Sequence, residues 1–197
     1  MMLITKISRP DDTLIDLACG KGGDFSKWIE ARLSFVFGVD LSKDNIENNI
    51  DGACARYLNL KKTTKTMPSA LFVIGDSQYN IRTGENMTDK AKQITSSVFG
   101  TVPRNAALGK GVEKHYAIGE NGFNVTSCQF ALHYFFKDTD ILNRFIRNVA
   151  ECTKVGGYFI GTCYDGKRIF NMLHGKKKEE EIELYQNKTK IWGVTKL

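Results

Sequence analysis

Residues 16–24 read DLACGKGGD, which places three glycines and a lysine between two aspartates. This stretch follows the short run Thr13–Ile15 and precedes Phe25, Trp28 and Ile29, which have helical spacing. A loop between a strand and a helix presents backbone N–H groups to a ligand, and its glycines let the ligand approach closely. The stretch therefore predicts a strand, a ligand-binding loop and a helix, the beginning of a βαβ unit.

The rest of the chain continues the alternation of short apolar runs and helical patterns. Strands are expected at 13–18, 35–40, 70–75, 123–129 and 158–163; helices at 42–60 (interrupted near Asp51–Gly52), 141–152 and 165–173; and a hairpin at 182–194 around Asn187–Lys188. The glycine pair Gly156–Gly157 is expected to end the helical segment before the last of these strands. This order predicts an α/β fold with a parallel sheet, helices on both faces and ligands at the carboxyl ends of the strands.

Composition sets the class of protein. The chain has 197 residues, 42% hydrophobic and 25% charged, which suits a single globular domain over 1–197. Residues 77–122 lack a sustained period and are interpreted as an insertion between the third and fourth strands. The five cysteines form no CxxC pair, so we expect free thiols and no metal. The chain has no apolar run of 18 residues and no signal-peptide layout, which predicts an intracellular protein without membrane contact.

Acidic residues follow the predicted strands. Asp40 comes 20 residues after Gly20, the placement of an acid that binds ribose hydroxyls. A dinucleotide is disfavoured because Ala18 replaces the first glycine of G-x-G-x-x-G and because Asp24 would repel a pyrophosphate. Together, Asp16 and Asp24 suit the cationic nucleoside S-adenosylmethionine. Asp76 and Ser77 would then meet its adenine. Any one of these aspartates, taken singly, could instead be a helix cap or a loop residue.

Two further features leave alternatives open. The net charge of +6 suits a polyanion, yet solvated loops account for it equally well. The segment Ser127–Phe136 (SCQFALHYFF) holds an aromatic run with one histidine, and such runs more often belong to a core. At the ligand edge of a sheet, however, aromatic faces stack on a base, and histidine or tyrosine can hydrogen-bond to the edge of that base.

With Asp16–Asp24, Ser127–Tyr134 and Gly156–Thr162 (GGYFIGT), the chain resembles the mRNA cap guanine-N7 methyltransferases over about 13–194. It looks most like the methyltransferase domain in capping enzymes of large nucleocytoplasmic DNA viruses. The resemblance implies a class I, Rossmann-like S-adenosylmethionine-dependent methyltransferase. It would methylate N7 of the cap guanine of 5′-capped mRNA, yielding cap 0 and S-adenosylhomocysteine, as part of a larger capping enzyme.

The resemblance also implies roles for individual residues. The cofactor would be bound by Asp16, Ala18, Gly20, Asp24, Asp40, Asp76, Ser77 and Gln129; the cap phosphates by Lys21 and Arg56; and the guanine by His133 and Tyr134. Guanine N7 carries no proton, so no catalytic base is expected and positioning alone would carry catalysis. The expected partners are the capped RNA 5′ end and other capping domains in the same polypeptide. The expected location is the host cytoplasm, in a viral factory, or the nucleus.

The chain departs from the family at three points. Ala18 stands where the family commonly has glycine. The family's N-terminal helix and its last strands are expected to be missing, which makes this a domain truncated at both ends whose activity alone is open. Two alternatives remain: a non-catalytic capping subunit that binds RNA or cofactor, and a small-molecule or transfer RNA methyltransferase of the same fold.

Overall fold

The computed structural model describes residues 3–197. They divide into two compact units, one ending at Thr162 and the other spanning Cys163–Leu197, and each is described by itself. The interpretation of 1–197 as one methyltransferase domain with an insertion at 77–122 stays a prediction. In the part of the chain that the structure describes, no helix combines the length and apolar character needed to cross a membrane.

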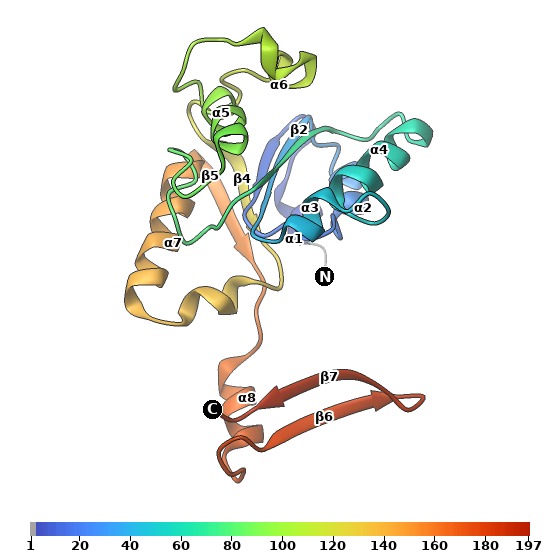
Figure 1. The fold of residues 1–197 in the computed structure, drawn as a ribbon, viewed down its shortest axis with the longest axis vertical. Helices are drawn as coiled ribbons and strands as arrows, with labels where there is room; N and C mark the ends of the chain where they lie inside the picture. The colour runs from blue at the N-terminus through green and yellow to red at the C-terminus, as the bar shows by residue number, and fades with distance from the viewer. Residues whose placement is uncertain (1–2) are drawn as a thin grey trace. The chain divides into compact units, whose positions relative to one another are not determined.

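A parallel sheet forms the centre of the first unit, with the strand order β3-β2-β1-β4-β5 (Figure 1). Its strands are β1 (Thr13–Asp16), β2 (Phe35–Asp40), β3 (Ser69–Ile74), β4 (Phe123–Cys128) and β5 (Thr153–Gly161). The chain proceeds outward from β1 to β3 and then returns to place β4 on the other side of β1. Ligands of parallel α/β sheets bind at such a reversal, outside the carboxyl ends of the strands. The predicted parallel α/β fold is confirmed.

One helix precedes these strands and the others lie between them in the chain. They are α1 (Leu3–Ile7), α2 (Phe25–Glu30), α3 (Lys43–Glu47), α4 (Ala53–Thr63), α5 (Asp89–Val98), α6 (Lys110–Lys114) and α7 (Thr139–Cys152), with 3₁₀ turns η1 (Ala106–Leu108) and η2 (Leu132–Phe136). The predicted interruption near Asp51–Gly52 is confirmed, since α3 and α4 are separate. Ser42 caps α3, and its side chain accepts a hydrogen bond from Asn45 N at 3.2 Å. The residues before β1 do contain a helix, although α1 is only five residues long.

The sheet is covered on both faces. Because neighbouring strand residues point to opposite faces, Leu14 and Ile15 belong to two different buried clusters. Leu14 packs in the cluster that contains Trp28 of α2 and Tyr57 of α4. Ile15 packs in the cluster that contains Phe145 of α7 and residues of α5. Figure 1 shows α2, α3 and α4 grouped near β2, with α5 and α7 toward β4 and β5.

The segment 77–122 contains helices that its sequence pattern does not reveal. Helix α5 begins after Thr88, whose side chain accepts a hydrogen bond from Ala91 N at 3.4 Å. Its buried residues are Ala91, Thr95, Ser96, Ser97 and Val98. Most of these are small or polar, so the usual apolar period of a core-facing helix is absent. Burial here follows from close packing rather than from large apolar side chains.

Strand β5 corrects one expectation from the sequence. Gly156 and Gly157 were expected to precede the strand, whereas β5 begins at Thr153 and runs through both glycines. The pairing with β4 shifts between Phe123 and Val125, and Gly156 has φ +79°. A Cβ on Gly157 would lie 2.7 Å from the Asn124 carbonyl oxygen. The glycines therefore form a bulge within the strand and not a break before it.

The second unit consists of α8 (Gly166–Leu173) and a hairpin of β6 (Glu181–Gln186) and β7 (Thr189–Thr195). The predicted hairpin around Asn187–Lys188 is confirmed. Both turn residues have positive φ, at 48° and 66°, the geometry that matches the twist of two antiparallel strands. Asp165 caps α8 by accepting a hydrogen bond from Arg168 N at 3.1 Å. Local signals, a helix cap and a hairpin turn, therefore define where α8 begins and where β6 and β7 meet.

Asn148 of α7 braces the loop that follows β3. Its side chain is 1% exposed and makes three hydrogen bonds to that loop. The amide nitrogen donates to the carbonyl oxygens of Ser77, at 2.7 Å, and Tyr79, at 2.6 Å. The amide oxygen accepts from Ile81 N at 2.9 Å. One buried side chain thus satisfies three backbone groups that no strand partner reaches.

We expect Asn148→Leu to destabilise the fold by about 3 kcal/mol or more. The leucine has a similar volume but leaves three buried backbone groups unsatisfied, at about 1–3 kcal/mol each. Denaturant unfolding measures the change. Asn143→Leu, on an exposed position of the same helix, is the matched control and should stay within about 0.5 kcal/mol of the parent. Equal stabilities for the two variants would contradict the bracing role.

Candidate functional site

The glycine loop between β1 and α2 adopts conformations that require glycine. Gly20 has φ +53° and Gly22 has φ +76°. A Cβ on Gly22 would lie 2.1 Å from Cζ of Phe25, so the aromatic ring fills the space that a side chain would need. Gly20 N donates a hydrogen bond to the Asp40 carboxylate at 2.8 Å. The loop is therefore folded back toward the end of β2.

Asp40 connects three segments at the end of β2. Its second carboxylate oxygen accepts hydrogen bonds from Ser42 N and Asn45 Nδ2, both at 2.9 Å. The residue is 9% exposed, yet it lines a cavity. A carboxylate offers about four acceptor positions, so Asp40 retains acceptor capacity toward that cavity. This is the arrangement that a hydroxyl-bearing ligand would need.

The cavity has a volume of about 260 Å³ and lies at the carboxyl ends of β1, β2 and β3. It is lined by Leu17, Ala18, Asp40, Leu41, Asn45, Gly75, Asp76, Ser77, Gln78, Ala131, Tyr134 and Phe135. The structure thus brings the predicted cofactor residues Ala18, Asp40, Asp76 and Ser77 together, and Tyr134, which was predicted to contact the guanine, lines the same cavity. The Asp76 carboxylate accepts from Gln78 N at 2.9 Å, and Ser77 Oγ donates to the Leu17 carbonyl at 2.6 Å. Ser77 therefore joins the end of β3 to the end of β1.

Asp16 is the last residue of β1, directly before the cavity residues Leu17 and Ala18, and it is 1% exposed. Burial, together with the nearby carboxylates of Asp24 and Asp40, raises the pKa of its carboxyl group to about 8. The Ala18 N–H, which donates to it at 3.3 Å, and the Lys27 ammonium act in the opposite direction. Near neutral pH the carboxyl group is mainly protonated. A cation bound beside it would favour its ionised form.

Several predicted residues lie outside the cavity lining. Asp24 forms an ion pair with Lys27 at the start of α2. The Lys21 ammonium pairs with Asp44 and Asp51, in both cases at 2.9 Å. Exposed pairs of this kind contribute little stability, so a phosphate could replace a carboxylate as the partner of Lys21. Arg56 donates to the Lys21 carbonyl oxygen, which places the two predicted phosphate ligands side by side.

The end of β4 is fastened to the end of β5. Gln129 Nε2 donates to Ser127 Oγ at 3.1 Å, and its Oε1 accepts from Thr162 Oγ1 at 3.2 Å. Thr162 Oγ1 also accepts from Phe130 N at 2.8 Å. Phe130 has φ +56°, an uncommon value for a bulky residue, and its side chain is 71% exposed. Gln129 is therefore placed beside the sheet edge without lining the cavity.

His133 and Tyr134 lie next to each other on η2, with ring centroids 4.3 Å apart. Tyr134 is 70% exposed, whereas Phe135 is buried against Phe145. Desolvation lowers the pKa of His133, which favours the neutral imidazole. Phe135 therefore belongs to the core and also lines the cavity together with Tyr134, whereas His133 is not among the lining residues. The run thus contains exposed residues as well as a core residue, and the roles expected for His133 and Tyr134 stay predictions.

Sequence reasoning missed residues that hold the site. Asn45 supports Asp40, Asn148 supports the loop after β3, and Thr162 supports Gln129. Asn45 carries a partial signal, because it follows the capping Ser42 by three residues. Asn148 and Thr162 carry none, since their partners lie 71 and 33 positions away in the chain.

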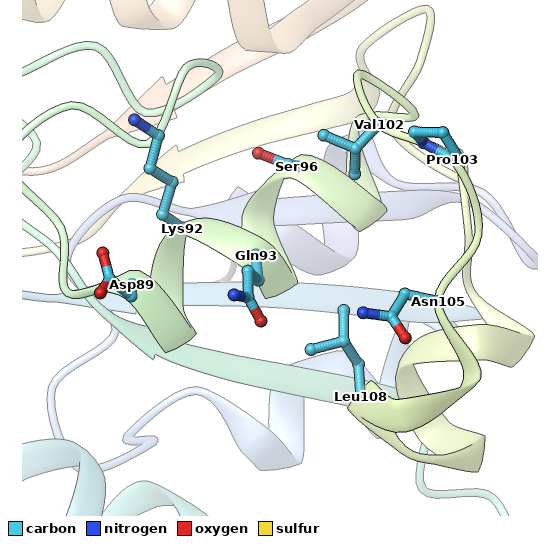
Figure 2. Close-up of a pocket in the computed structure, with 8 residues that line it drawn as sticks. All are labelled: Asp89, Lys92, Gln93, Ser96, Val102, Pro103, Asn105 and Leu108. Carbon is cyan, nitrogen blue, oxygen red and sulfur yellow. The ribbon is translucent and has the colours of Figure 1, made fainter.

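A second hollow of about 380 Å³ lies within the segment 77–122 (Figure 2). Asp89, Lys92, Gln93 and Ser96 line it from α5, and Val102, Pro103, Asn105 and Leu108 face them from the following segment. It includes no predicted site residue and no strand end. The cavity at the strand ends is therefore the better candidate for a nucleoside.

Comparison with known proteins identifies relatives of the chain. The family model of the mRNA (guanine-N(7))-methyltransferase domain matches residues 1–190. A probable mRNA-capping enzyme of Acanthamoeba polyphaga mimivirus is 31% identical over 89% of this chain. An mRNA cap guanine-N(7) methyltransferase of Eremothecium gossypii is 34% identical over 94% of it. The chain spans only 14% and 35% of the lengths of these two relatives.

Solved structures agree on the fold. An S-adenosylmethionine-dependent methyltransferase from Clostridium acetobutylicum has a TM-score of 0.54 at 15% identity. The match covers 93% of this chain and 52% of that protein. At this identity the likeness bears on the fold alone, and it confirms the expected Rossmann-like architecture of class I methyltransferases.

We expect the free energy of unfolding to fall as the pH rises, because the pKa of Asp16 is raised in the folded state. The unfolded carboxyl group titrates near pH 3.9 and the folded one at about 8, so between these values the folded state holds the extra proton. This contribution is fully present below the unfolded pKa and is lost as pH rises through the folded pKa. From about pH 6.5 to 8, the parent should lose up to about 1.4 kcal/mol per pH unit relative to Asp16→Asn.

Denaturant unfolding at several pH values in this window measures the difference. His133, whose pKa is lowered by desolvation, is present in both the parent and Asp16→Asn, so its contribution drops out of the difference between them. Asp140→Asn, at an exposed position of α7, should keep the slope of the parent. Identical slopes for the parent and Asp16→Asn would mean that Asp16 is already ionised in the folded protein.

Proposed function

Because this chain belongs to the mRNA (guanine-N(7))-methyltransferase domain family, we propose that it transfers a methyl group from S-adenosylmethionine to N7 of the cap guanine of 5′-capped RNA. We further propose that it does so within a larger capping polypeptide. The similarity to a viral mRNA-capping enzyme, of which the chain spans 14%, supports this context. An intracellular location, in a viral factory or the nucleus, stays a prediction.

The observation that carries the proposal is the row of acidic groups along one edge of the sheet. Asp16, Asp40 and Asp76 lie at or next to the ends of three adjacent strands, and two of them line the same cavity. A volume of about 260 Å³ is just under the usual range of about 300–1,000 Å³ for ligand pockets and suits the nucleoside half of the cofactor. The residues present therefore fit S-adenosylmethionine.

Each acidic group has a distinct part in this proposal. Asp40, with acceptor capacity left after three hydrogen bonds, would bind the ribose hydroxyls. Asp76 and Ser77 would border the adenine. The buried Asp16 would become ionised beside the positive charge of the amino acid part. Binding would thus expel a proton from Asp16, which makes cofactor affinity rise with pH toward 8.

The reaction asks little acid–base chemistry of the protein. S-adenosylmethionine, when bound, supplies an electrophilic methyl group on a sulfonium. Guanine N7 offers a lone pair without a proton, so no side chain needs to remove one. The residues around the cavity hold the acceptor in line and exclude water, and such positioning can contribute about 7 kcal/mol or more. Neutral His133 and exposed Tyr134 are the groups proposed to hold the guanine.

Incubation with methyl-labelled S-adenosylmethionine tests the function. We expect label to enter RNA that begins with Gppp, and none to enter the same RNA that begins with m7Gppp, because its N7 is occupied. Free cap analogue should compete with the RNA, and transfer RNA should not. Liquid-scintillation counting of purified RNA measures the transfer.

Other outcomes of this assay favour other functions. Equal labelling of the two RNAs would contradict N7 as the acceptor atom. Labelling of transfer RNA alone would favour a different methyltransferase of the same fold. If no RNA is labelled while calorimetry shows binding of S-adenosylmethionine, the non-catalytic capping subunit becomes the better description.

We expect Asp40→Ala to weaken S-adenosylmethionine binding by about 10- to 100-fold. The change removes charge-assisted hydrogen bonds worth about 1.5–3 kcal/mol each. Cap-analogue affinity should change by less than about threefold, since the groups that donate hydrogen bonds to Asp40 belong to Gly20, Ser42 and Asn45, and none of these is a predicted cap residue. Calorimetric titration with each ligand gives both numbers. Asp140→Ala removes the same charge from exposed α7 and should leave both affinities unchanged.

A larger loss of cap affinity than of cofactor affinity would mean that the cofactor and cap halves of the site are assigned in reverse. Asp40→Asn keeps the size of the side chain and guards against a general loosening of the glycine loop. The S-adenosylmethionine affinity of Asp40→Asn should lie between that of the parent and that of Asp40→Ala.

A further inference from the structure

A groove of about 510 Å³ lies between the glycine loop and one face of α4. The α4 residues that line it are Arg56, Asn59, Leu60 and Thr63, at the i, i+3, i+4 and i+7 spacing that places side chains on one side of a helix. Gly22, Gly23, Phe25 and Ser26 line the opposite wall. We call this hollow the α4 groove. The α4 groove is distinct from the cofactor cavity, because the two hollows share no lining residue.

The α4 groove lies in a stretch of uniform charge. Residues 52–75 contain Arg56, Lys61, Lys62 and Lys65 and no aspartate or glutamate. All four cationic residues are exposed, and none has a carboxylate within 4.0 Å among residues 3–197. Lys62 Nζ lies 3.4 Å from Asn59 Oδ1, which brings its ammonium group to the rim of the groove. The groove is therefore suited to an anionic occupant.

The groove continues from the residues proposed to bind the cap phosphates. Arg56 lines it and also donates to the carbonyl oxygen of Lys21. The same glycine loop serves both hollows, because the cofactor cavity takes Leu17 and Ala18 from its start and the groove takes Gly22 and Gly23 from its end. A polyanion leaving Lys21 and Arg56 would thus meet the α4 groove next.

We propose that the α4 groove binds the first nucleotides of the RNA that follow the cap. This inference rests on the proposed function, because it takes the cap phosphates to lie at Lys21 and Arg56. The eight residues from Arg56 to Thr63 span about 10 Å of helix, room for about three phosphates at the spacing of a stacked strand.

In this proposal the groove contacts the sugar-phosphate backbone of the RNA and not the RNA bases. Its one aromatic residue, Phe25, is 4% exposed and offers no face on which a base could stack. Arg56, Asn59, Thr63 and Lys62 instead present charged or hydrogen-bonding groups that suit phosphate and sugar oxygens. Binding is therefore independent of sequence and depends strongly on salt.

The test compares a capped RNA of about 20 nucleotides with a capped dinucleotide, using the whole chain. Lys62→Glu and Thr63→Glu place negative charge at the groove without touching Lys21 or Arg56. We expect each to raise the Kd for the capped RNA about tenfold by fluorescence anisotropy, and to reduce the slope of log K against log salt by about 0.7 per lost contact. The Kd for the capped dinucleotide should not change. Lys114→Glu, an equal charge reversal on exposed α6, is the matched control and should bind like the parent.

The outcomes separate this inference from the proposed function. Unchanged RNA binding by both groove variants overturns the inference, whether or not the chain methylates caps. An equal loss in the Lys114→Glu control also overturns it, because the effect would then come from net charge. If groove variants lose RNA affinity while the parent methylates no cap, the groove stands as an RNA site and the N7 transfer fails.

Discussion

The hydrogen bond from Gly20 N to the Asp40 carboxylate determines the shape of the site. It joins the loop after β1 to the end of β2, two segments that the parallel sheet brings next to each other. It acts together with the backbone hydrogen bond from Cys19 N to the Val39 carbonyl oxygen, at 3.0 Å, which joins the same two segments. Asp40 makes this bond while also accepting from Ser42 N and Asn45 Nδ2, so one carboxylate organises the loop, the start of α3 and the cavity wall.

Burial gives the acids of this edge different properties. Asp16 is enclosed and has a raised pKa, whereas Asp24 is ion-paired with Lys27. Asp40 is stabilised by three donors from its surroundings. A cationic ligand that entered this region would exchange its contacts with water for contacts with negative groups that are already held in place. Such preorganised groups stabilise charge at little cost in reorganisation. The same arrangement would disfavour a pyrophosphate, for the reason already visible in the sequence.

Strands, helices and the side chains that support loops from a distance differ in how well the sequence predicts them. The strands around residues 16–24 were predictable, because β2 is buried throughout and reads as one apolar run. Helix α5 was not, because its buried face consists largely of Ala, Thr and Ser. Five of the twelve residues that line the cavity, among them Ala18, Asp40 and Asp76, could be named in advance because they lie at or soon after strand ends. Asn148 and Thr162 could not, because a brace depends on contacts between distant parts of the chain that no local pattern encodes.

Phe130 at the end of β4 has a consequence for the direction of the chain. A left-handed conformation costs a bulky residue of order 1–3 kcal/mol, and here its backbone N–H is held by Thr162 Oγ1 on the neighbouring strand side. If the peptide relaxed to an extended conformation, the chain would continue straight off the sheet. The kink instead turns the chain into η2, so that Ala131, Tyr134 and Phe135 reach the lining of the cavity.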